Sequence, residues 1–312
     1  MAKKKLFCCR YAVISLCFIP LCLRAQLPQP SIGTITRYEN FTSVYIRPRN
    51  IDVWLPENYS KGKKFSVLYM HDGQMLFDSS TTWNHQEWDV ETTINDLVKK
   101  GKIRECIVVA IWNGGQYRHA EYFPQKPFES LPKNKQDLVF AAVRSKDYNL
   151  FADSIQSDKY LKFLVKELKP FIDKTYSVES NPTHTFIAGS SMGGLISLYA
   201  ICEYPEVFGA AACLSTHWPG IFNMNVNPVP EAFFDYLRLH LPAPNQHKIY
   251  FDYGSTTLDS LYKPYQLQAD KIMQAKGYKK KSWMTKEFIG EPHSEEAWRK
   301  RFYIPLKFMM KK

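Results

Sequence analysis

The sequence predicts an α/β protein in which helices cover both faces of a mostly parallel central sheet. Six compact apolar runs have the length of buried strands, and amphipathic stretches of helical spacing lie between several of them. Of the 312 residues, 45% are hydrophobic and 15% are aromatic, which excludes a disordered chain and supplies a large core. Strands that alternate with helices are typical of a parallel sheet, and continuous apolar strands fit a sheet buried on both faces.

The expected strands begin with two at the edge of the sheet. Residues 43–46 and 52–55 alternate apolar and polar side chains around Pro48, as antiparallel edge strands do. The core strands are expected at residues 65–70, 107–112, 185–188, 210–214, 248–251 and 283–288.

Helical spacing of apolar residues predicts four helices. They are expected at residues 89–100, 158–168, 195–204 and 265–275. Two long segments rich in polar and aromatic residues, 123–155 and 218–245, interrupt the alternation. We expect them to be insertions over the active edge of the sheet, where substrate specificity is decided.

Residues 1–25 have the pattern of a secretory signal peptide. A lysine-rich start precedes 13 uncharged residues from Tyr11 to Leu23, a stretch that is short for a membrane span, and cleavage is expected after Ala25. An uncleaved membrane anchor is the alternative. We therefore expect a signal peptide over residues 1–25, a single domain over residues 26–312, and export to the periplasm or the medium.

The basic charge of the chain lies partly in that segment. Removal of residues 1–25 takes away five basic residues and no acidic one, which lowers the formal net charge from +11 to +6. The remaining basic runs are short, and no nucleic-acid-binding module accompanies them, so no nucleic-acid partner is expected. After cleavage, no membrane association is expected either.

Neither the spacing of the cysteines nor a complete zinc-binding motif indicates a zinc enzyme. Only Cys106, Cys202 and Cys213 lie outside residues 1–25, without metal-ligand spacing. We expect buried thiols, with a bridge between Cys202 and Cys213 as the alternative. His119-Ala120-Glu121 matches the first part of a deaminase motif, but the cysteine pair that completes it is missing. We therefore predict no metal and no cofactor.

The pattern with the clearest chemical meaning is Gly189-Ser190-Ser191-Met192-Gly193. It matches G-x-S-x-G, and it lies between an apolar strand and a helix, as in a nucleophile elbow. Glycines permit the tight turn, and the helix N-terminus favours negative charge that develops at the serine. We predict Ser191 as a nucleophile.

A serine nucleophile needs a base and an acid, which follow it in the order acid and then histidine in this type of site. His293 follows the strand at 283–288, at the edge where α/β sites lie, and is the predicted base. Asp259 and Asp252 both follow the strand at 248–251, and we prefer Asp259. The second histidine near this edge, His217, is predicted to belong to the substrate pocket.

Two backbone N–H groups are expected to form the oxyanion hole. Met192 directly follows the nucleophile. Gln74 belongs to His71-Asp72-Gly73-Gln74, which follows the strand at 65–70, and Gly73 lets this backbone approach the substrate.

These residues resemble the putative esterase family of α/β-hydrolases, which includes esterase D, feruloyl esterases, enterochelin esterases and mycolyltransferases. The resemblance spans residues 51–308, and rests on residues 68–74, 83–88, 187–194, 253–259, Pro292-His293 and Trp298. It implies an α/β-hydrolase fold and ester hydrolysis through an acyl-enzyme. The gap from Gly254 to Asp259 is slightly longer than the commonest form in the family, so Asp252 stays open as the acid.

The substrate is predicted to be a small-molecule or oligosaccharide ester, with feruloyl or acetyl groups on carbohydrates as the first choice. Siderophore esters, acyl transfer to an alcohol, and a hydrolase fold that binds without turnover are the alternatives. The oligomeric state is left open. The predicted pocket residues follow strands at the active edge and are Trp112, Arg118, Glu121, His217 and Trp218.

Overall fold

A computed structural model describes residues 26–146, 148–222 and 226–311, so the predicted signal peptide lies outside the described residues. The main sheet of the described chain has eight strands in the order β1-β2-β4-β3-β7-β8-β9-β10. All neighbours from β4 to β10 are parallel, whereas β1 and β2 are antiparallel to their neighbours. The strands are β1 (Thr34–Phe41), β2 (Arg49–Leu55), β3 (Ser66–His71), β4 (Cys106–Ile111), β7 (Thr185–Ser190), β8 (Ala210–Leu214), β9 (Lys248–Gly254) and β10 (Trp283–Phe288).

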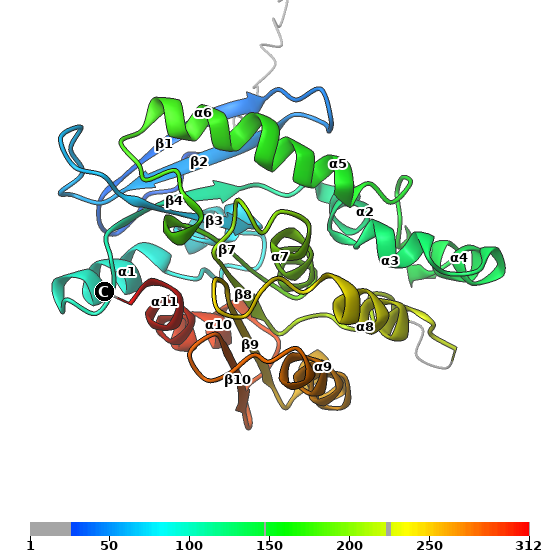
Figure 1. Ribbon diagram of the computed structural model, residues 1–312. Coiled ribbons are helices and arrows are strands. Elements are labelled where there is room, and N and C mark those ends of the chain that lie inside the picture. Colours follow the sequence, from blue (N-terminus) through cyan, green and yellow to red (C-terminus); the bar gives the residue numbers. More distant parts are fainter. Residues whose placement is uncertain (1–25, 147, 223–225, 312) are drawn as a thin grey trace, which may run out of the picture.

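Helices cover both faces of this sheet, as expected for an α/β-hydrolase fold (Figure 1). One face carries α5 (Ser157–Lys162), α6 (Lys169–Thr175), α7 (Met192–Glu203), α8 (Val229–His240) and α9 (Lys263–Ala275). The other face carries α1 (Val90–Lys99), α10 (Glu295–Arg301) and α11 (Tyr303–Met310). Successive residues of one strand enter opposite cores: Val67 packs in the first and Leu68 in the second. This alternation explains why the central strands carry apolar residues on both faces.

The first edge strand differs from the prediction. Residues 43–46 form no strand, and β1 lies earlier, at Thr34–Phe41. The Ser43 hydroxyl accepts hydrogen bonds from the backbone N–H groups of Tyr45 at 2.9 Å and Ile46 at 3.2 Å. These local bonds hold the backbone in a turn, so it is not available to the sheet.

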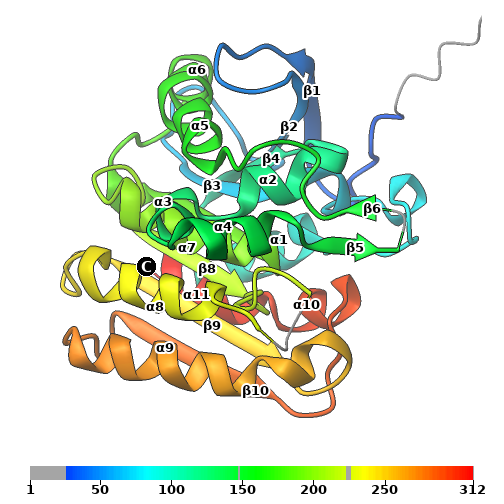
Figure 2. The same ribbon diagram turned by 90° about the vertical axis from the view of Figure 1, so that its right-hand side faces the viewer.

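The two predicted insertions are folded. Residues 123–155 contain α3 (Gln125–Glu129), α4 (Lys133–Phe140) and a small hairpin of β5 (Val143–Ser145) and β6 (Tyr148–Asn149); α8 lies in residues 218–245. Figure 2 shows the hairpin beyond the end of α4. The helix expected at 158–168 is longer than predicted, because a π-helical turn at Phe163–Leu168 joins α5 to α6.

The described cysteines are unpaired and buried, so Cys202 and Cys213 form no disulfide. Burial raises the pKa of the Cys106 thiol to about 12. In the described part of the chain, no helix combines the length and the apolar character that crossing a membrane requires.

Candidate active site

Ser191 occupies a sharp turn between β7 and α7. Its backbone has φ 58° and ψ −122°, a conformation that a residue with a side chain rarely adopts. Three backbone hydrogen bonds hold the turn: the Ser191 N–H donates to Leu214 at 2.9 Å, and the Ser191 carbonyl accepts from Leu195 at 3.1 Å and His217 at 3.2 Å. The strained serine is therefore fixed by the neighbouring strand and by the following helix.

Close packing around the Ser191 turn explains the glycine at Gly189. A Cβ on Gly189 would lie 2.7 Å from the backbone carbonyl carbon of Gly193, and one on Gly194 would lie 3.0 Å from the Leu214 oxygen. Because backbone atoms cannot move aside easily, only glycine fits at Gly189.

A cavity of about 700 Å³ opens above this turn, where the carboxyl ends of the parallel strands meet. Ser191 and His293 both line it. So do Gln74 and Met192, the two residues predicted to supply oxyanion-hole donors. The structure thus brings four predicted residues from distant parts of the sequence to one cavity.

Asp259 lies behind His293 and is fully buried. Its Oδ1 is 2.5 Å from Nδ1 of His293, while its Oδ2 accepts from the Ser215 hydroxyl at 2.6 Å and from the Gly254 N–H at 2.5 Å. Burial alone would raise the pKa of Asp259, but the hydrogen bonds from His293, Ser215 and Gly254 outweigh it and lower that pKa. An ionised Asp259 requires the hydrogen of His293 on Nδ1, which leaves Nε2 as a base.

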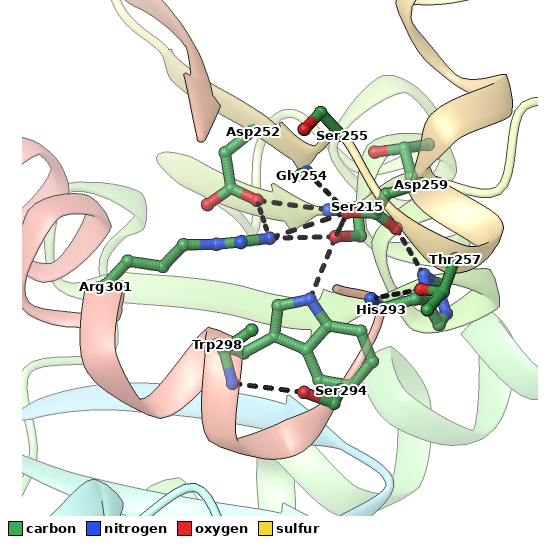
Figure 3. A network of polar contacts seen from close by, with 12 residues as sticks. Ser215, Asp252, Gly254, Ser255, Thr257, Asp259, His293, Ser294, Trp298 and Arg301 are labelled. Carbon is green, nitrogen blue, oxygen red and sulfur yellow. Dashed lines mark hydrogen bonds and ion pairs between the residues drawn. The ribbon is translucent and has the colours of Figure 1, made fainter. Parts of the chain in front are cut away.

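Ser215 connects Asp259 to a second buried group of polar residues (Figure 3). Its hydroxyl oxygen accepts from Trp298 Nε1 and from Arg301 Nη2, both at 2.9 Å. Since indole and guanidinium nitrogens can only donate, the single hydroxyl hydrogen of Ser215 must point to Asp259. Sequence reasoning missed Ser215 and Arg301; the position of Ser215 directly after β8 was the available signal.

Asp252, the alternative acid, belongs to that second group and has no hydrogen bond to His293 among the described contacts. It accepts from Arg301 at 2.9 Å and from the Tyr250 hydroxyl at 2.9 Å. Burial raises the pKa of Asp252, and its ion pair with Arg301 opposes that effect without overcoming it. Its position indicates that Asp252 fixes Arg301, which in turn donates to Ser215.

The imidazole of His293 is held from several sides. Its ring meets the rings of Trp298 and Tyr262 edge-on, with centroid distances of 4.9 and 5.8 Å. The Ser191 hydroxyl contacts Tyr262, and in the described part of the chain it is not hydrogen-bonded to His293. Hydrogen bonds between nucleophile and base commonly tighten only when substrate is bound.

The loop that carries Gln74 is braced by an ion pair. Asp72 has a left-handed backbone, with φ 55°, and its carboxylate accepts two hydrogen bonds from Arg118 at 2.6 and 2.7 Å. A Cβ on Gly73 would lie 2.5 Å from the carbonyl carbon of Ala110, so this position also needs glycine. Gln74 and Met192 each lie in the first turn of a helical segment, where N–H groups lack intrahelical acceptors.

The predicted pocket residues divide into two groups. Arg118 and His217 line the cavity. The other three point elsewhere, because their polar groups are bound in the protein: Trp112 donates to Asp52, Trp218 donates to Gln266, and Glu121 pairs with Arg49 at 2.6 Å. Further residues of the cavity wall that sequence reasoning did not assign to the pocket include His119, Arg144, Phe222, Leu258 and Glu295.

Comparisons with known proteins point to esterases. A family model described as Putative esterase matches residues 43–303. A curated relative, the endo-1,4-beta-xylanase/feruloyl esterase of Xylanibacter ruminicola, is 24% identical over 62% of this chain and 22% of its own. The chain spans between 22% and 60% of the length of five curated relatives that it matches.

Solved structures show the same fold at low sequence identity. A ferulic acid esterase from Anaeromyces mucronatus, solved with ferulic acid, has a TM-score of 0.59 at 18% identity and covers 93% of this chain and 95% of its own. The enterobactin esterase FES of Shigella flexneri has a TM-score of 0.61 at 16% identity, over 90% of this chain and 60% of its own. Because the family model matches most of the chain, the conclusion is that this protein belongs to the Putative esterase family.

Proposed function

We propose that this protein is an exported serine esterase that removes feruloyl or acetyl groups from carbohydrates. The single observation that carries the mechanism is the cavity shared by Ser191, on its strained turn, and by His293, whose Nδ1 is 2.5 Å from buried Asp259.

In the first half-reaction, Nε2 of His293 takes the proton of Ser191, and the serine oxygen attacks the ester carbonyl. The N–H groups of Gln74 and Met192 donate to the negative oxygen of the tetrahedral intermediate. His293 then gives its proton to the departing alcohol, and the acyl group remains on Ser191. Asp259 stays ionised throughout and stabilises the imidazolium.

In the second half-reaction, His293 removes a proton from water, and the resulting hydroxide attacks the acyl-enzyme. Collapse of the intermediate breaks the bond to Ser191, which recovers its proton from His293. The products are a carboxylic acid and an alcohol.

The carbohydrate part of the proposal is supported by the aromatic side chains around the cavity and by two similar proteins that are feruloyl or ferulic acid esterases. Trp83, Trp88, Trp298 and Phe222 line the cavity, and Trp83 is 82% exposed. An exposed indole is a stacking surface for a sugar ring or for a phenolic acyl group. The relatives named as feruloyl or ferulic acid esterases act on esters of that kind.

A substrate panel tests this function. Purified protein is assayed with an aryl acetate, a feruloylated oligosaccharide, an acetylated oligosaccharide and a siderophore ester, with Ser191→Ala and the exposed-site control Ser60→Ala in parallel. We expect turnover of the carbohydrate esters that falls by about 10⁴-fold in Ser191→Ala and is unchanged in Ser60→Ala. Binding of these esters without any turnover that depends on Ser191 would refute the proposal.

Export is tested separately, by N-terminal sequencing of the protein recovered from the periplasm or the medium. The proposal expects the mature chain to begin at Gln26. A chain that keeps residues 1–25 and sediments with membranes would show an uncleaved anchor instead.

A further inference from the structure

One wall of the cavity carries hydrogen-bonding nitrogens that the proposed reaction does not use. His119, His217 and Phe222 line this wall. The Phe222 ring lies against both imidazoles, with centroid distances of 6.5 Å to His119 and 5.3 Å to His217. His217 is only 2% exposed, and its Nε2 has no hydrogen-bond partner among the described residues. A polar atom buried without a partner beside an active-site cavity is a feature that a ligand can satisfy.

The hydrogen position on His119 follows from its contact with the backbone. Nε2 of His119 is 2.7 Å from the carbonyl oxygen of Gly220, and a carbonyl oxygen can only accept. The hydrogen is therefore on Nε2, and Nδ1 of His119 is an acceptor.

His217 has the opposite polarity. Its Nδ1 is 2.8 Å from the Tyr262 hydroxyl, and burial raises the pKa of Tyr262 well above 10, so the phenol keeps its proton. An imidazole nitrogen is a stronger acceptor than the Ser191 hydroxyl, the other group in contact with Tyr262. Tyr262 therefore donates to Nδ1 of His217, which places the ring hydrogen on Nε2 and makes that nitrogen a donor.

Both imidazoles are neutral at working pH. Burial lowers the pKa of His119 to about 3 and that of His217 well below its ordinary value, and nearby Arg118 adds to both effects. The wall thus offers one neutral donor and one neutral acceptor, together with an aromatic ring.

We propose that Nε2 of His217 and Nδ1 of His119 form a subsite that binds a hydroxyl group of the ester substrate, which accepts from His217 and donates to His119. A hydroxyl is the common small group that both donates and accepts. A carboxylate could not donate to His119, and an alkyl group would leave His217 unpaired. The inference rests on the proposed esterase function and specifies the substrate further, as an ester with a free hydroxyl group.

The hydroxyl can belong to the acyl group or to the alcohol, and two pairs of esters distinguish these sources. The acyl pair is methyl 4-hydroxycinnamate and methyl cinnamate; the alcohol pair is a monoacetylated methyl xyloside and cyclohexyl acetate. In at least one pair, we expect the wild-type protein to prefer the hydroxylated ester by about 10- to 100-fold in kcat/KM.

Variants assign that preference to the two histidines. His217→Phe and His119→Phe should each remove most of it, by lowering kcat/KM for the hydroxylated ester more than for the plain ester, so that the ratio of the two falls towards one. His217→Gln, which keeps a side-chain donor, should restore part of it, and His240→Phe at an exposed position is the control. A variant that loses activity equally on both members of a pair would assign His217 a structural role and contradict the proposal.

A binding measurement on a protein that does not turn over substrate gives an independent readout. Calorimetry with Ser191→Ala should show tighter binding of the hydroxylated member of the preferred pair. The subsite is refuted if the wild-type protein hydrolyses the two esters of each pair equally well. If that hydrolysis is lost in Ser191→Ala, the proposed esterase function still stands. If no ester is turned over in a Ser191-dependent manner, the proposed function itself fails.

Discussion

Ser215 is the residue through which the acid of the site is connected to the rest of the buried polar network. The partners of its hydroxyl group determine where the hydroxyl hydrogen lies. Trp298 and Arg301 can only donate and both donate to the Ser215 oxygen, so Ser215 donates its hydrogen to Asp259. Its backbone has φ 41°, an uncommon value for serine, which shows that the surrounding structure holds it in place. One small side chain therefore links β8, the loop after β9, and α10.

Exchanging each candidate acid for its amide separates their roles. We expect Asp259→Asn to lower kcat by about 10³- to 10⁴-fold with little change in stability, because an amide cannot hold Nδ1–H of His293 in the required tautomer. Asp252→Asn should keep kcat within about 10-fold but destabilise the fold by about 3 kcal/mol, since buried Arg301 loses its ion pair at 2.9 Å and keeps only the longer one to Asp259 at 3.8 Å. Ester kinetics and urea unfolding of both variants measure these effects, and the reverse ranking of the kinetic losses would identify Asp252 as the acid.

Removal of the Ser215 hydroxyl tests its role as a positioning residue. Ser215→Ala should lower kcat by about 10-fold and destabilise the protein by about 1–3 kcal/mol, because Asp259 loses a donor while Trp298 and Arg301 lose an acceptor. Loss of that donor also raises the pKa of Asp259, so the acidic limb of the kcat–pH profile should change shape in Ser215→Ala. Ser60→Ala serves as the surface control, and a profile identical to wild type would contradict the assignment.

At the scale of elements, the turn from β7 to α7 is tightly constrained. The serine lies at positive φ, and backbone atoms fill the space on either side of the turn. The adjacent loop after β3 repeats this arrangement, with Asp72 at positive φ and Gly73 packed against β4. Close packing of the two turns sets the positions of Ser191, Gln74 and Met192 relative to one another.

A methyl group at Gly189 tests that packing. Gly189→Ala introduces a Cβ about 2.7 Å from the Gly193 backbone carbon, so we expect a loss of about 2–4 kcal/mol in stability and of most activity. Gly62→Ala is the matched control, because a Cβ there meets no atom within 4 Å and should change stability by less than about 1 kcal/mol. Thermal unfolding of the two variants gives the comparison, and equal melting temperatures would contradict the close approach.

At the scale of the whole molecule, the fold keeps several histidines buried and neutral. Burial lowers the pKa of both His71 and His119 to about 3, and His217 also has a strongly lowered pKa. In the unfolded chain these groups take up protons near pH 6.5, whereas the folded protein does not. The folded state is therefore stabilised above that pH and loses stability as the pH falls from about 6.5 towards 3.

This linkage predicts a steep acid dependence of stability. Each such histidine contributes a slope of about 1.4 kcal/mol per pH unit in the free energy of unfolding over that window. His71→Gln should reduce the measured slope by about that amount, and His240→Gln, at an exposed position, should not. Urea denaturation at several pH values between 7.5 and 4.5 measures the slopes, and parallel curves for wild type and His71→Gln would refute the effect.

The sequence by itself determined the elements whose signals are local. Strands buried on both faces need mainly apolar residues, so the five inner strands were predicted within a few residues. The sixth, β10, lies at the predicted position, but it is an edge strand without a buried residue, so its burial was predicted wrongly. The turn at Ser191 was predicted in the same way, because a strand, a glycine-flanked serine and a helix follow one another in the chain. The edge strand β1 was missed because its side chains are polar or only partly buried, and Ser43 directs the following residues into a turn.

Only the tertiary structure decided which groups meet across the sheet. The carboxyl ends of β8 and β9 and the start of α10 bring Ser215, Asp259 and Trp298 together, although they lie up to 83 residues apart in the chain. Trp112, Glu121 and Trp218 do not line the cavity, because the polar group of each side chain is bonded to a buried partner elsewhere in the fold. Partner choice among buried polar groups depends on distance and direction in space, which a linear sequence does not contain.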